Sequence, residues 1–240
     1  MIKVENLDVW GFQHAIRGMR NPKNSWERSD STISEYVSLD DAGHYTVTPV
    51  ASLGDNDLSL MRTLYKAGTE HRTYARMIQV SMDITAPLYW WKEMDRYTVG
   101  KSQVSCSTMH KIAAKEFELD DFSWEHLFKE SDEEMTPEYY AVEGYMFSPL
   151  SGLEILRDIL NACRQKYLET KDKRWWWQLI QLLPSSYNQK RTVCMSYETV
   201  FKIIKERTGH KLDEWNDFIV VLKNLPYVKE ITDNEESGGF

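Results

Sequence analysis

The sequence has little from which to build a disulfide framework, a metal site or a membrane span. Its 240 residues include three cysteines, Cys106, Cys163 and Cys194, which share no metal-ligand spacing. The chain does not open with a charged segment followed by an apolar run, and no apolar stretch is long enough to span a membrane. We therefore expect a reduced, cytoplasmic protein with no membrane segment and no metal.

Excess positive charge is also lacking. The formal net charge is −8 and the sequence pI is near 5.3. Binding to a nucleic-acid backbone needs clustered lysine and arginine, so this balance argues against nucleic acid as a partner. A local basic pocket for one small anion remains compatible with it.

The common short catalytic signatures are absent as well. The sequence contains no glycine-rich phosphate loop, no H-E-x-x-H and no G-x-S-x-G. Its six histidines are scattered, with no pair at metal-ligand spacing. His71 stands out because "GTEHRTYAR" joins the end of a predicted helix to a predicted strand, and such corners often contact ligands. A purely structural role for His71 is the alternative.

Aromatic residues are abundant, with nine tryptophans and thirteen tyrosines in a chain of ordinary globular composition. Large flat side chains serve cores, interfaces and stacking surfaces equally well. Trp175, Trp176 and Trp177 cannot all face one direction on a helix. At least one of them must lie at an interface, a ligand surface or the solvent boundary.

Periodicity predicts a mixed α+β fold. Ile78, Val80, Met82 and Ile84 alternate with polar residues, which is the clearest strand pattern in the chain. Helical patterns follow in "SGLEILRDILNACRQKYLE", "KRWWWQLIQLLP" and the segment that runs from a Ser196 cap to Gly209. We expect one domain over residues 1–230, with an acidic, solvated insert near 118–150 and a mobile acidic tail over 231–240.

A polar segment follows the predicted helix "LYWWKEM". We predict a loop there, and hydroxyls and backbone N–H groups in such a loop can bind phosphate with one lysine as a point charge. An ordinary polar surface turn is the alternative. The candidate side chains of the loop are Thr98, Lys101, Ser102, Gln103, Ser105, Ser107 and Thr108.

Two short basic clusters, "KRTVC" and "KERTGHK", occur later in the chain. Such clusters are typical of solvated helix faces.

The order of these segments resembles the flavin-dependent thymidylate synthases. In that family a helix, a corner with a histidine, a strand and a proline-started helix lead to an R-H-R-x7-S-x-R motif. The stretch from "LMRTLYKAGTEH" to "DRYTVGKSQVSCSTMHK" follows that order, and "LIQLLPSSYNQKRTVCMSYETVFKIIKERTGHKLDEW" is similar to the second block of the family. The resemblance covers roughly residues 57–219, apart from 118–150.

What the resemblance implies is specific. Members are homotetramers with a central antiparallel-type sheet flanked by helices, and their sites lie between protomers. They bind FAD and, with methylene-tetrahydrofolate and NADPH as co-substrates, reductively methylate dUMP to dTMP. No enzyme nucleophile attacks the pyrimidine, so the resemblance assigns no catalytic residue. The protein binds and orients while the cofactor carries the chemistry.

The resemblance also assigns binding residues. Gln103 and Ser105 match the serine half of the motif, and Arg207 matches the arginine that closes the later helix. Ser102 stands where asparagine is usual. The expected dUMP-like set is Lys92, Ser102, Gln103, Ser105 and Arg207. The expected FAD set is His71, Arg96, Tyr97 and Ser196.

Departures from the family pattern concern the anion-binding arginines. Asp95, Arg96 and Tyr97 replace Arg-His-Arg, and Ser107 replaces the final arginine. A shift by one residue would align Arg96 with the first arginine, but it would spoil the Gln-x-Ser match. Lost arginine bonds weaken nucleotide binding unless Lys101, Lys92 or Arg174 substitutes. We expect an enzyme of this type; the alternative is a catalytically inactive oligomer that binds a nucleotide or a protein.

Overall fold

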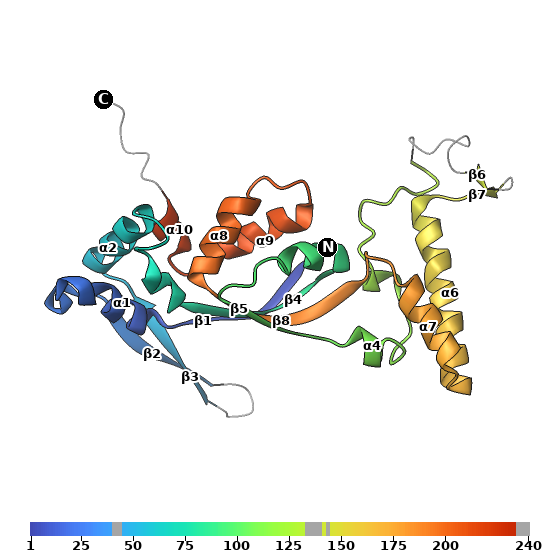
Figure 1. The fold of residues 1–240 in the computed structure, drawn as a ribbon, viewed down its shortest axis with the longest axis horizontal. Coiled ribbons are helices and arrows are strands. Elements are labelled where there is room, and N and C mark those ends of the chain that lie inside the picture. Colours follow the sequence, from blue (N-terminus) through green and yellow to red (C-terminus); the bar gives the residue numbers. More distant parts are fainter. Residues whose placement is uncertain (40–44, 133–140, 143–144, 234–240) are drawn as a thin grey trace. The chain divides into compact units, whose positions relative to one another are not determined.

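The computed structural model describes residues 1–39, 45–132, 141–142 and 145–233 (Figure 1). The predicted mobile tail lies outside these residues from position 234 onward. The fold is mixed α+β with antiparallel strands, as predicted. The strands are β1 Lys3–Trp10, β2 Thr32–Leu39, β3 Tyr45–Ser52, β4 Gln79–Pro87, β5 Lys101–Ser105, β6 Ala141–Val142, β7 Tyr145–Met146 and β8 Asn188–Ser196.

Helices connect most of these strands, and three helices follow the last strand. The α-helices are α1 Phe12–Arg20, α2 Asp55–Lys66, α3 Leu88–Met94, α4 Thr108–Lys111, α6 Pro149–Thr170, α7 Lys173–Leu182, α8 Tyr197–Arg207, α9 Asp213–Lys223 and α10 Val228–Thr232. Short 3-10 helices cover Asn21–Lys23, Trp26–Arg28, Thr73–Arg76 and Leu119–Asp121. Among the described helices, none is both long and apolar enough to cross a membrane.

The main sheet has four strands in the order β1-β4-β8-β5. In β4, buried and half-buried residues alternate, and Val80, Met82 and Ile84 are fully buried. The burial along β4 thus alternates with the period of two that the sequence predicts for this strand. A separate antiparallel hairpin pairs β2 with β3, with Thr32 opposite Ser52 and Leu39 opposite Tyr45.

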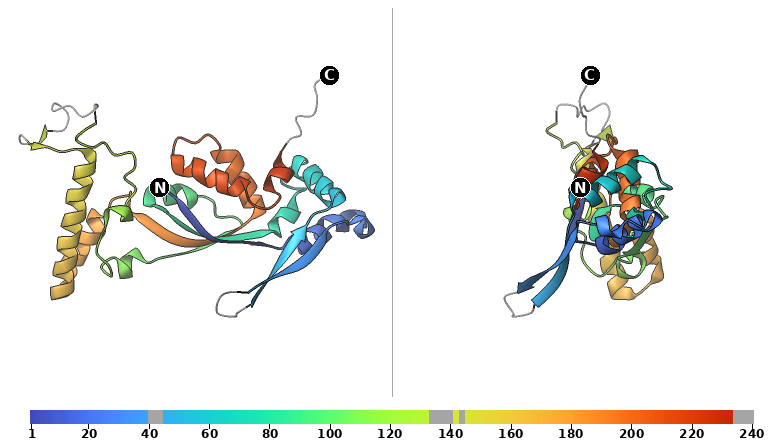
Figure 2. Two further views of the ribbon diagram at one scale, coloured as in Figure 1. Left: turned by 180° about the vertical axis from the view of Figure 1, so that it is seen from behind. Right: turned by 90° about the vertical axis from the view of Figure 1, so that its left-hand side faces the viewer.

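The chain comprises two compact units. Unit 1 consists of Met1–Lys3, Ile84–Arg96 and Val104–Arg191, and unit 2 consists of Val4–Asp83, Tyr97–Gln103 and Thr192–Phe240. In unit 1, α6 and α7 lie side by side (Figures 1 and 2). In unit 2, α8 packs on α9 and α10 packs on α2. The single domain over residues 1–230 stays a prediction.

The core of unit 1 includes part of the acidic segment that we expected to be solvated. Phe117 and Phe122 are buried and stack with ring centroids 6.1 Å apart, and both pack with Leu153 and Leu160 of α6. The acidic residues around Phe122 therefore flank a buried aromatic anchor. Burial of two phenylalanines outweighs the charge pattern of the sequence here.

The cap of α6 lies earlier than the apolar pattern suggests. Ser148 is the N-cap residue, and its hydroxyl accepts a hydrogen bond from the backbone N–H of Ser151 at 3.0 Å. Pro149 follows at the first helical position, which its fixed φ favours. Serine caps α8 in the same way, because Ser196 accepts from Thr199 N–H at 3.4 Å, as predicted.

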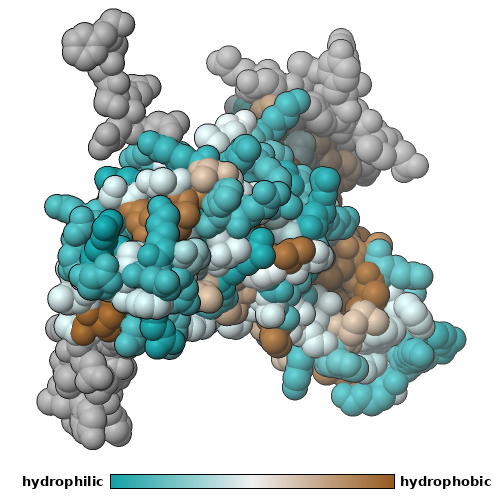
Figure 3. Space-filling model, turned by 60° about the vertical axis from the view of Figure 1, so that its left-hand side comes forward, coloured by the Kyte–Doolittle hydropathy of each residue, from teal (hydrophilic) through white to brown (hydrophobic). Residues whose placement is uncertain are grey.

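The tryptophan triplet on α7 divides between core and surface, as its spacing requires. Trp176 packs against the core of unit 1, and its indole N–H donates to the Met109 carbonyl at 3.1 Å. Trp175 and Trp177 stay 37% and 42% exposed. On the face drawn in Figure 3, hydrophobic residues reach the surface in separate groups among hydrophilic ones.

Candidate functional site

The polar segment after α3 is an edge strand and not only a loop. Residues Lys101–Ser105 form β5, the last strand of the main sheet. Four of its five side chains are polar and the fifth, Val104, is exposed, which is why periodicity alone did not predict a strand. Lys101 donates to Gln103 Oε1 at 3.1 Å along one face of β5, while Ser102 and Ser105 are exposed. Both serines can therefore reach a ligand.

Residues Val99 and Gly100 are fixed against the start of α8. The Ser196 N–H donates to the Gly100 carbonyl at 2.9 Å, and the Thr199 hydroxyl donates to the Val99 carbonyl at 2.9 Å. Gly100 has φ +68°, a conformation that favours glycine. A Cβ at position 100 would lie 2.7 Å from Ser196 Oγ and 2.9 Å from Thr199 Oγ1. The backbone before β5 thus depends on glycine.

Gly100→Ala should lower the free energy of unfolding by about 2–3 kcal/mol, from backbone strain plus the clash with two hydroxyls. Gly68→Ala is the matched control, because Gly68 has φ +108° but no atom lies within 4 Å of its added Cβ. That control should cost about 1 kcal/mol, from strain alone. Chemical denaturation of both variants measures the difference. Equal losses would contradict close packing at Gly100.

Tyr97 and Arg207, both predicted site residues, lie together in unit 2. Arg207 Nε donates to the Tyr97 hydroxyl at 3.0 Å, and its guanidinium carbon lies 4.6 Å from the centroid of the buried Trp215 ring. Arg207 Nη1 is 3.1 Å from His210 Nε2. This arrangement fixes a half-buried cation between aromatic rings, where it can meet an anion or a planar ring.

Burial dominates the titration of the tyrosine in this cluster. It raises the pKa of the Tyr97 hydroxyl above its ordinary value, although the hydrogen bond from Arg207 acts in the opposite direction. Tyr97 therefore stays a neutral phenol at physiological pH. The positive charge of the cluster is carried by Arg207.

Unit 1 holds a second arginine cluster, which the sequence did not reveal. Arg191 Nη1 donates to Asp95 Oδ1 at 2.8 Å, and its Nε donates to Gln189 Oε1 at 2.9 Å. The guanidinium carbon lies 4.3 Å from the centroid of the Trp91 ring, and the Trp91 indole N–H donates to the Gln189 carbonyl. Asp95 is where the resemblance expects an arginine, so a neutral ion pair stands at that position.

The signal for this cluster was present in "KRTVC", which we expected to form a solvated helix face. That segment lies in β8, where a side chain points to one or the other face of the sheet. The side chain of Arg191 is only 12% exposed. A strand position opposite a tryptophan and a carboxylate cannot be read from local sequence, because the partners lie nearly a hundred residues away.

The remaining predicted residues divide between the two units. Lys92, Arg96 and Ser105 belong to unit 1, and all three are exposed. Ser102, Gln103, Ser196 and His71 belong to unit 2 together with the Tyr97–Arg207 pair. Ser196 is buried as a helix cap. The roles of these residues in ligand binding stay predictions.

His71 lies exposed at the corner between α2 and β4, as its place in the sequence suggested. Its backbone N–H donates to the Gly68 carbonyl at 3.1 Å. The neighbouring Arg72 makes the structural contact at this corner. Its guanidinium pairs with Glu198 at 2.7 Å and lies over the Tyr65 ring. The imidazole of His71 is thus left at the surface of a fixed corner.

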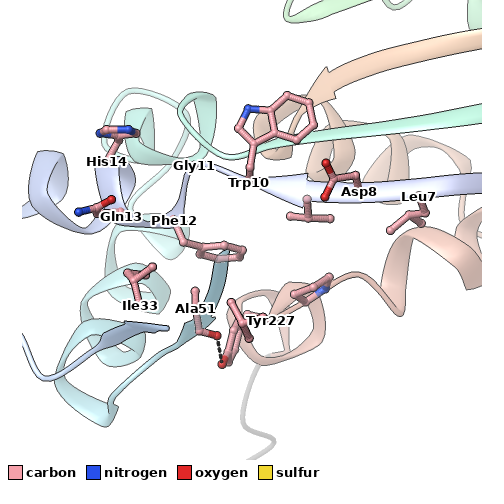
Figure 4. Close-up of a pocket in the computed structure, with 13 residues that line it drawn as sticks. Leu7, Asp8, Trp10, Gly11, Phe12, Gln13, His14, Ile33, Ala51 and Tyr227 are labelled. Atoms are coloured by element: carbon pink, nitrogen blue, oxygen red, sulfur yellow. Dashed lines mark hydrogen bonds between the residues drawn. The ribbon is translucent and has the colours of Figure 1, made fainter. Parts of the chain in front are cut away.

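Unit 2 also contains a cavity of about 440 Å³, drawn in Figure 4. Apolar side chains dominate it, and Trp10, Phe12 and Ile33 are among its walls. The Tyr227 hydroxyl, at its edge, donates to the Ala51 carbonyl at 3.1 Å. None of the predicted site residues lines this cavity. In the part of the chain that the structure describes, no group of three metal-ligating side chains occurs.

The fold that carries these residue clusters is also found in proteins of known structure. The chain is similar to flavin-dependent thymidylate synthase ThyX from Helicobacter pylori complexed with FAD and dUMP, with a TM-score of 0.62 and 17% identity, over 96% of this chain and 98% of that one. A second structure of that enzyme with FAD and dUMP has a TM-score of 0.61 and 16% identity, over 96% of each chain. No family model and no curated protein matches. The chain therefore has the fold of flavin-dependent thymidylate synthase, in a form whose sequence has diverged far from it.

Proposed function

We propose that this protein binds FAD and a pyrimidine nucleotide. The observation that carries the proposal is the similarity of fold over 96% of the chain to an enzyme complexed with FAD and dUMP. The pairing of Tyr97 with Arg207 supports it, because both were expected at the ligands from the sequence and they share a hydrogen bond. Reductive methylation of dUMP, with methylene-tetrahydrofolate and NADPH, is the activity that this binding would serve.

The residues present fit a pyrimidine nucleotide only in part. Arg207 offers a cation held beside the Trp215 ring, which suits an anionic or planar ligand. The Asp95 carboxylate, in contrast, repels phosphate, and its pair with Arg191 leaves no net charge there. Each charge-assisted arginine bond is worth about 1.5–3 kcal/mol, so losing two weakens nucleotide binding by orders of magnitude. We infer a lower affinity for dUMP than an intact motif would give.

A bound FAD would supply the hydride chemistry, and the residues of this chain would bind and orient the reactants. Ser105, exposed at the end of β5, would donate a hydrogen bond to the nucleotide, whereas Ser102 lies three positions earlier and so on the opposite face of the strand. Arg96 in unit 1 and His71 in unit 2 are both exposed, and each is a separate candidate for contact with the cofactor. Homo-oligomer formation belongs to the same proposal, because sites of this type are shared between protomers.

The visible absorption spectrum of the purified protein, with and without added FAD, tests the first half of the proposal. We expect a bound-flavin spectrum, and we expect dUMP to change it. In Arg207→Gln the dUMP titration should shift to concentrations about 10–100-fold higher, the size of one charged hydrogen bond. Arg157→Gln is the matched control, because Arg157 pairs with Asp158 on the exposed side of α6.

Failure of the protein to bind FAD at all would overturn the proposal. An unchanged dUMP titration in Arg207→Gln would remove Arg207 from the nucleotide site while leaving flavin binding in place. Growth of a thymidine-requiring bacterial strain on expression of the chain would establish the methylation itself. Flavin binding without such growth would assign binding but not this reaction.

A second candidate is a catalytically inactive interaction module. The observation in its favour is the exposure of Trp175 and Trp177 on α7, since aromatic residues are enriched at protein interfaces. Such a protein would tolerate Arg207→Gln and would lose its partner on Trp175→Ala. The flavin spectrum separates the two candidates.

A further inference from the structure

Unit 1 contains a cavity of about 480 Å³ that no part of the proposed function uses. Its lining residues come from α4, from the C-terminal end of α6 and from the N-terminal end of α7. Its walls include the Tyr167 and Trp176 rings, with Ile112 at its buried base. Lys171 and Lys173 stand at its rim, beside His110. Among the residues that line it, none is acidic.

Both rim lysines lack an ion pair among the described residues, although the chain as a whole is acidic. The nearby carboxylates are bound to other cations. Asp172 pairs with Arg174 at 2.6 Å, and Glu169 pairs with Lys166 at 3.0 Å. Two ammonium groups therefore remain uncompensated at one concave surface. A concave site with unpaired cations concentrates anions.

Aromatic rings hold these lysines in place. The Lys171 ammonium lies 5.9 Å from the centroid of Tyr167, and the Lys173 ammonium lies 5.7 Å from that of Trp177. Trp176 is fixed by its hydrogen bond to the Met109 carbonyl and by edge contact with Trp177. The Trp176 wall is thus oriented by contacts within the protein. Rigid aromatic faces next to cations suit a planar ring that carries an anion.

The backbone at Lys171 is unusual for a lysine. Lys171 is the residue that ends α6, with φ +55°, where glycine is the residue that most often closes a helix. A lysine there costs backbone energy that glycine would not. The left-handed turn carries the chain directly into α7, so that Lys171 and Lys173 both reach the cavity.

We propose that this cavity is a binding site for a planar aromatic ring bearing a phosphate or carboxylate. The ring stacks within the walls formed by Tyr167 and Trp176. The anion is bound by the ammonium groups of Lys171 and Lys173. The proposal does not depend on flavin or dUMP binding, because all of the residues involved lie in unit 1 and none of them was assigned to those ligands.

Isothermal titration with adenosine monophosphate and with 4-aminobenzoyl-glutamate tests the site, one probe for each anion. At least one of the two probes should bind. A compound that lacks either the ring or the anion of that probe should bind at least 10-fold more weakly. Adenosine and inorganic phosphate supply the separate parts of the first probe, and 4-aminobenzamide supplies the ring of the second. The probe that binds identifies the anion as phosphate or carboxylate.

The variants are matched to the geometry. Lys171→Gly keeps the left-handed turn and removes the charge, and Lys173→Gln keeps the helix. Together they should weaken binding at least 10-fold without lowering the melting temperature. Lys166→Gln, on α6 but paired with Glu169, should leave binding unchanged. The proposal would be overturned if neither probe binds or if the uncharged ring binds as tightly as the complete probe. It would also be overturned if the lysine variants bind the probe as tightly as the unchanged protein does.

Discussion

Asp57→Asn should lower the free energy of unfolding by about 3–5 kcal/mol, the cost of leaving a buried charge without its partner. Arg20 Nε donates to Asp57 Oδ1 at 2.6 Å, and the two side chains are 5% and 0% exposed. Arg20 has few other partners, because its Nη1 reaches the Ser25 carbonyl at 3.3 Å and its Nη2 has none in the described part of the chain. Urea denaturation measures the loss.

The same pair predicts how stability depends on pH. Burial alone would raise the pKa of the Asp57 carboxyl, but hydrogen bonds from Ser31, Ser29 and the arginine outweigh burial and hold it below its ordinary value of 3.8. A carboxyl with a lowered folded pKa stabilises the fold fully above its unfolded pKa. That contribution is lost as the pH falls through the folded value. Asp57→Asn should therefore flatten the acid limb of the stability curve.

The control for this prediction is an exposed ion pair of the same charge type. Lys202 and Glu206 are 4.0 Å apart on α8, and their side chains are 58% and 47% exposed. Lys202→Gln should change stability by less than about 0.5 kcal/mol, because water and salt screen such pairs. A loss in Asp57→Asn as small as that of the control would show that Arg20 finds another partner or reaches solvent.

Local sequence predicted those elements whose burial follows their own pattern. The alternation from Ile78 to Ile84 gave β4, and the Ser196 cap gave the start of α8. Strand β5 was missed because an edge strand with polar side chains on both faces carries no period of two. The buried anchor Phe122 was missed because acidic neighbours hid it.

The candidate site was predicted as a list of residues but not as an arrangement. Tyr97 and Arg207 are 110 positions apart and were each assigned from a motif, yet their hydrogen bond depends on how the segment before β5 packs on α8 in unit 2. The Arg191–Asp95 pair shows the converse: Arg191 was assigned from no motif, yet the fold brings it to a motif position. A motif position that loses its arginine can receive one from a distant strand, and only the fold reveals it.

That exchange of charges also limits what the altered motif can bind. An isolated arginine at position 95 would present a full positive charge to a phosphate. The observed pair presents a carboxylate already satisfied by Arg191, which is itself fixed by Gln189 and the Trp91 ring. A ligand group that donates hydrogen bonds suits the exposed Asp95 better than one that accepts them. Under the proposed function, the anionic group of the ligand would then depend on Arg207.

Trp215→Ala should cost about 3–5 kcal/mol of unfolding free energy, as expected when a large buried aromatic is removed. The Trp215 ring is fully buried in α9, with Phe218 at 6.1 Å and Tyr97 at 6.2 Å between ring centroids. Thermal or urea denaturation checks the loss. Trp177→Ala is the control, because that ring is 42% exposed and its removal should cost less than about 1 kcal/mol.

The tryptophan also supports Arg207, so its loss should extend beyond stability. Without the ring 4.6 Å from its guanidinium, Arg207 loses one of the contacts that hold it and gains freedom to move. Trp215→Phe retains a ring at lower cost, which allows binding to be measured on a folded protein. Under the proposed function it should weaken dUMP binding less than Arg207→Gln does. If Trp215→Phe loses as much affinity as Arg207→Gln, the tryptophan ring itself contacts the nucleotide. If Trp215→Phe loses no affinity, Tyr97 and His210 suffice to hold the arginine.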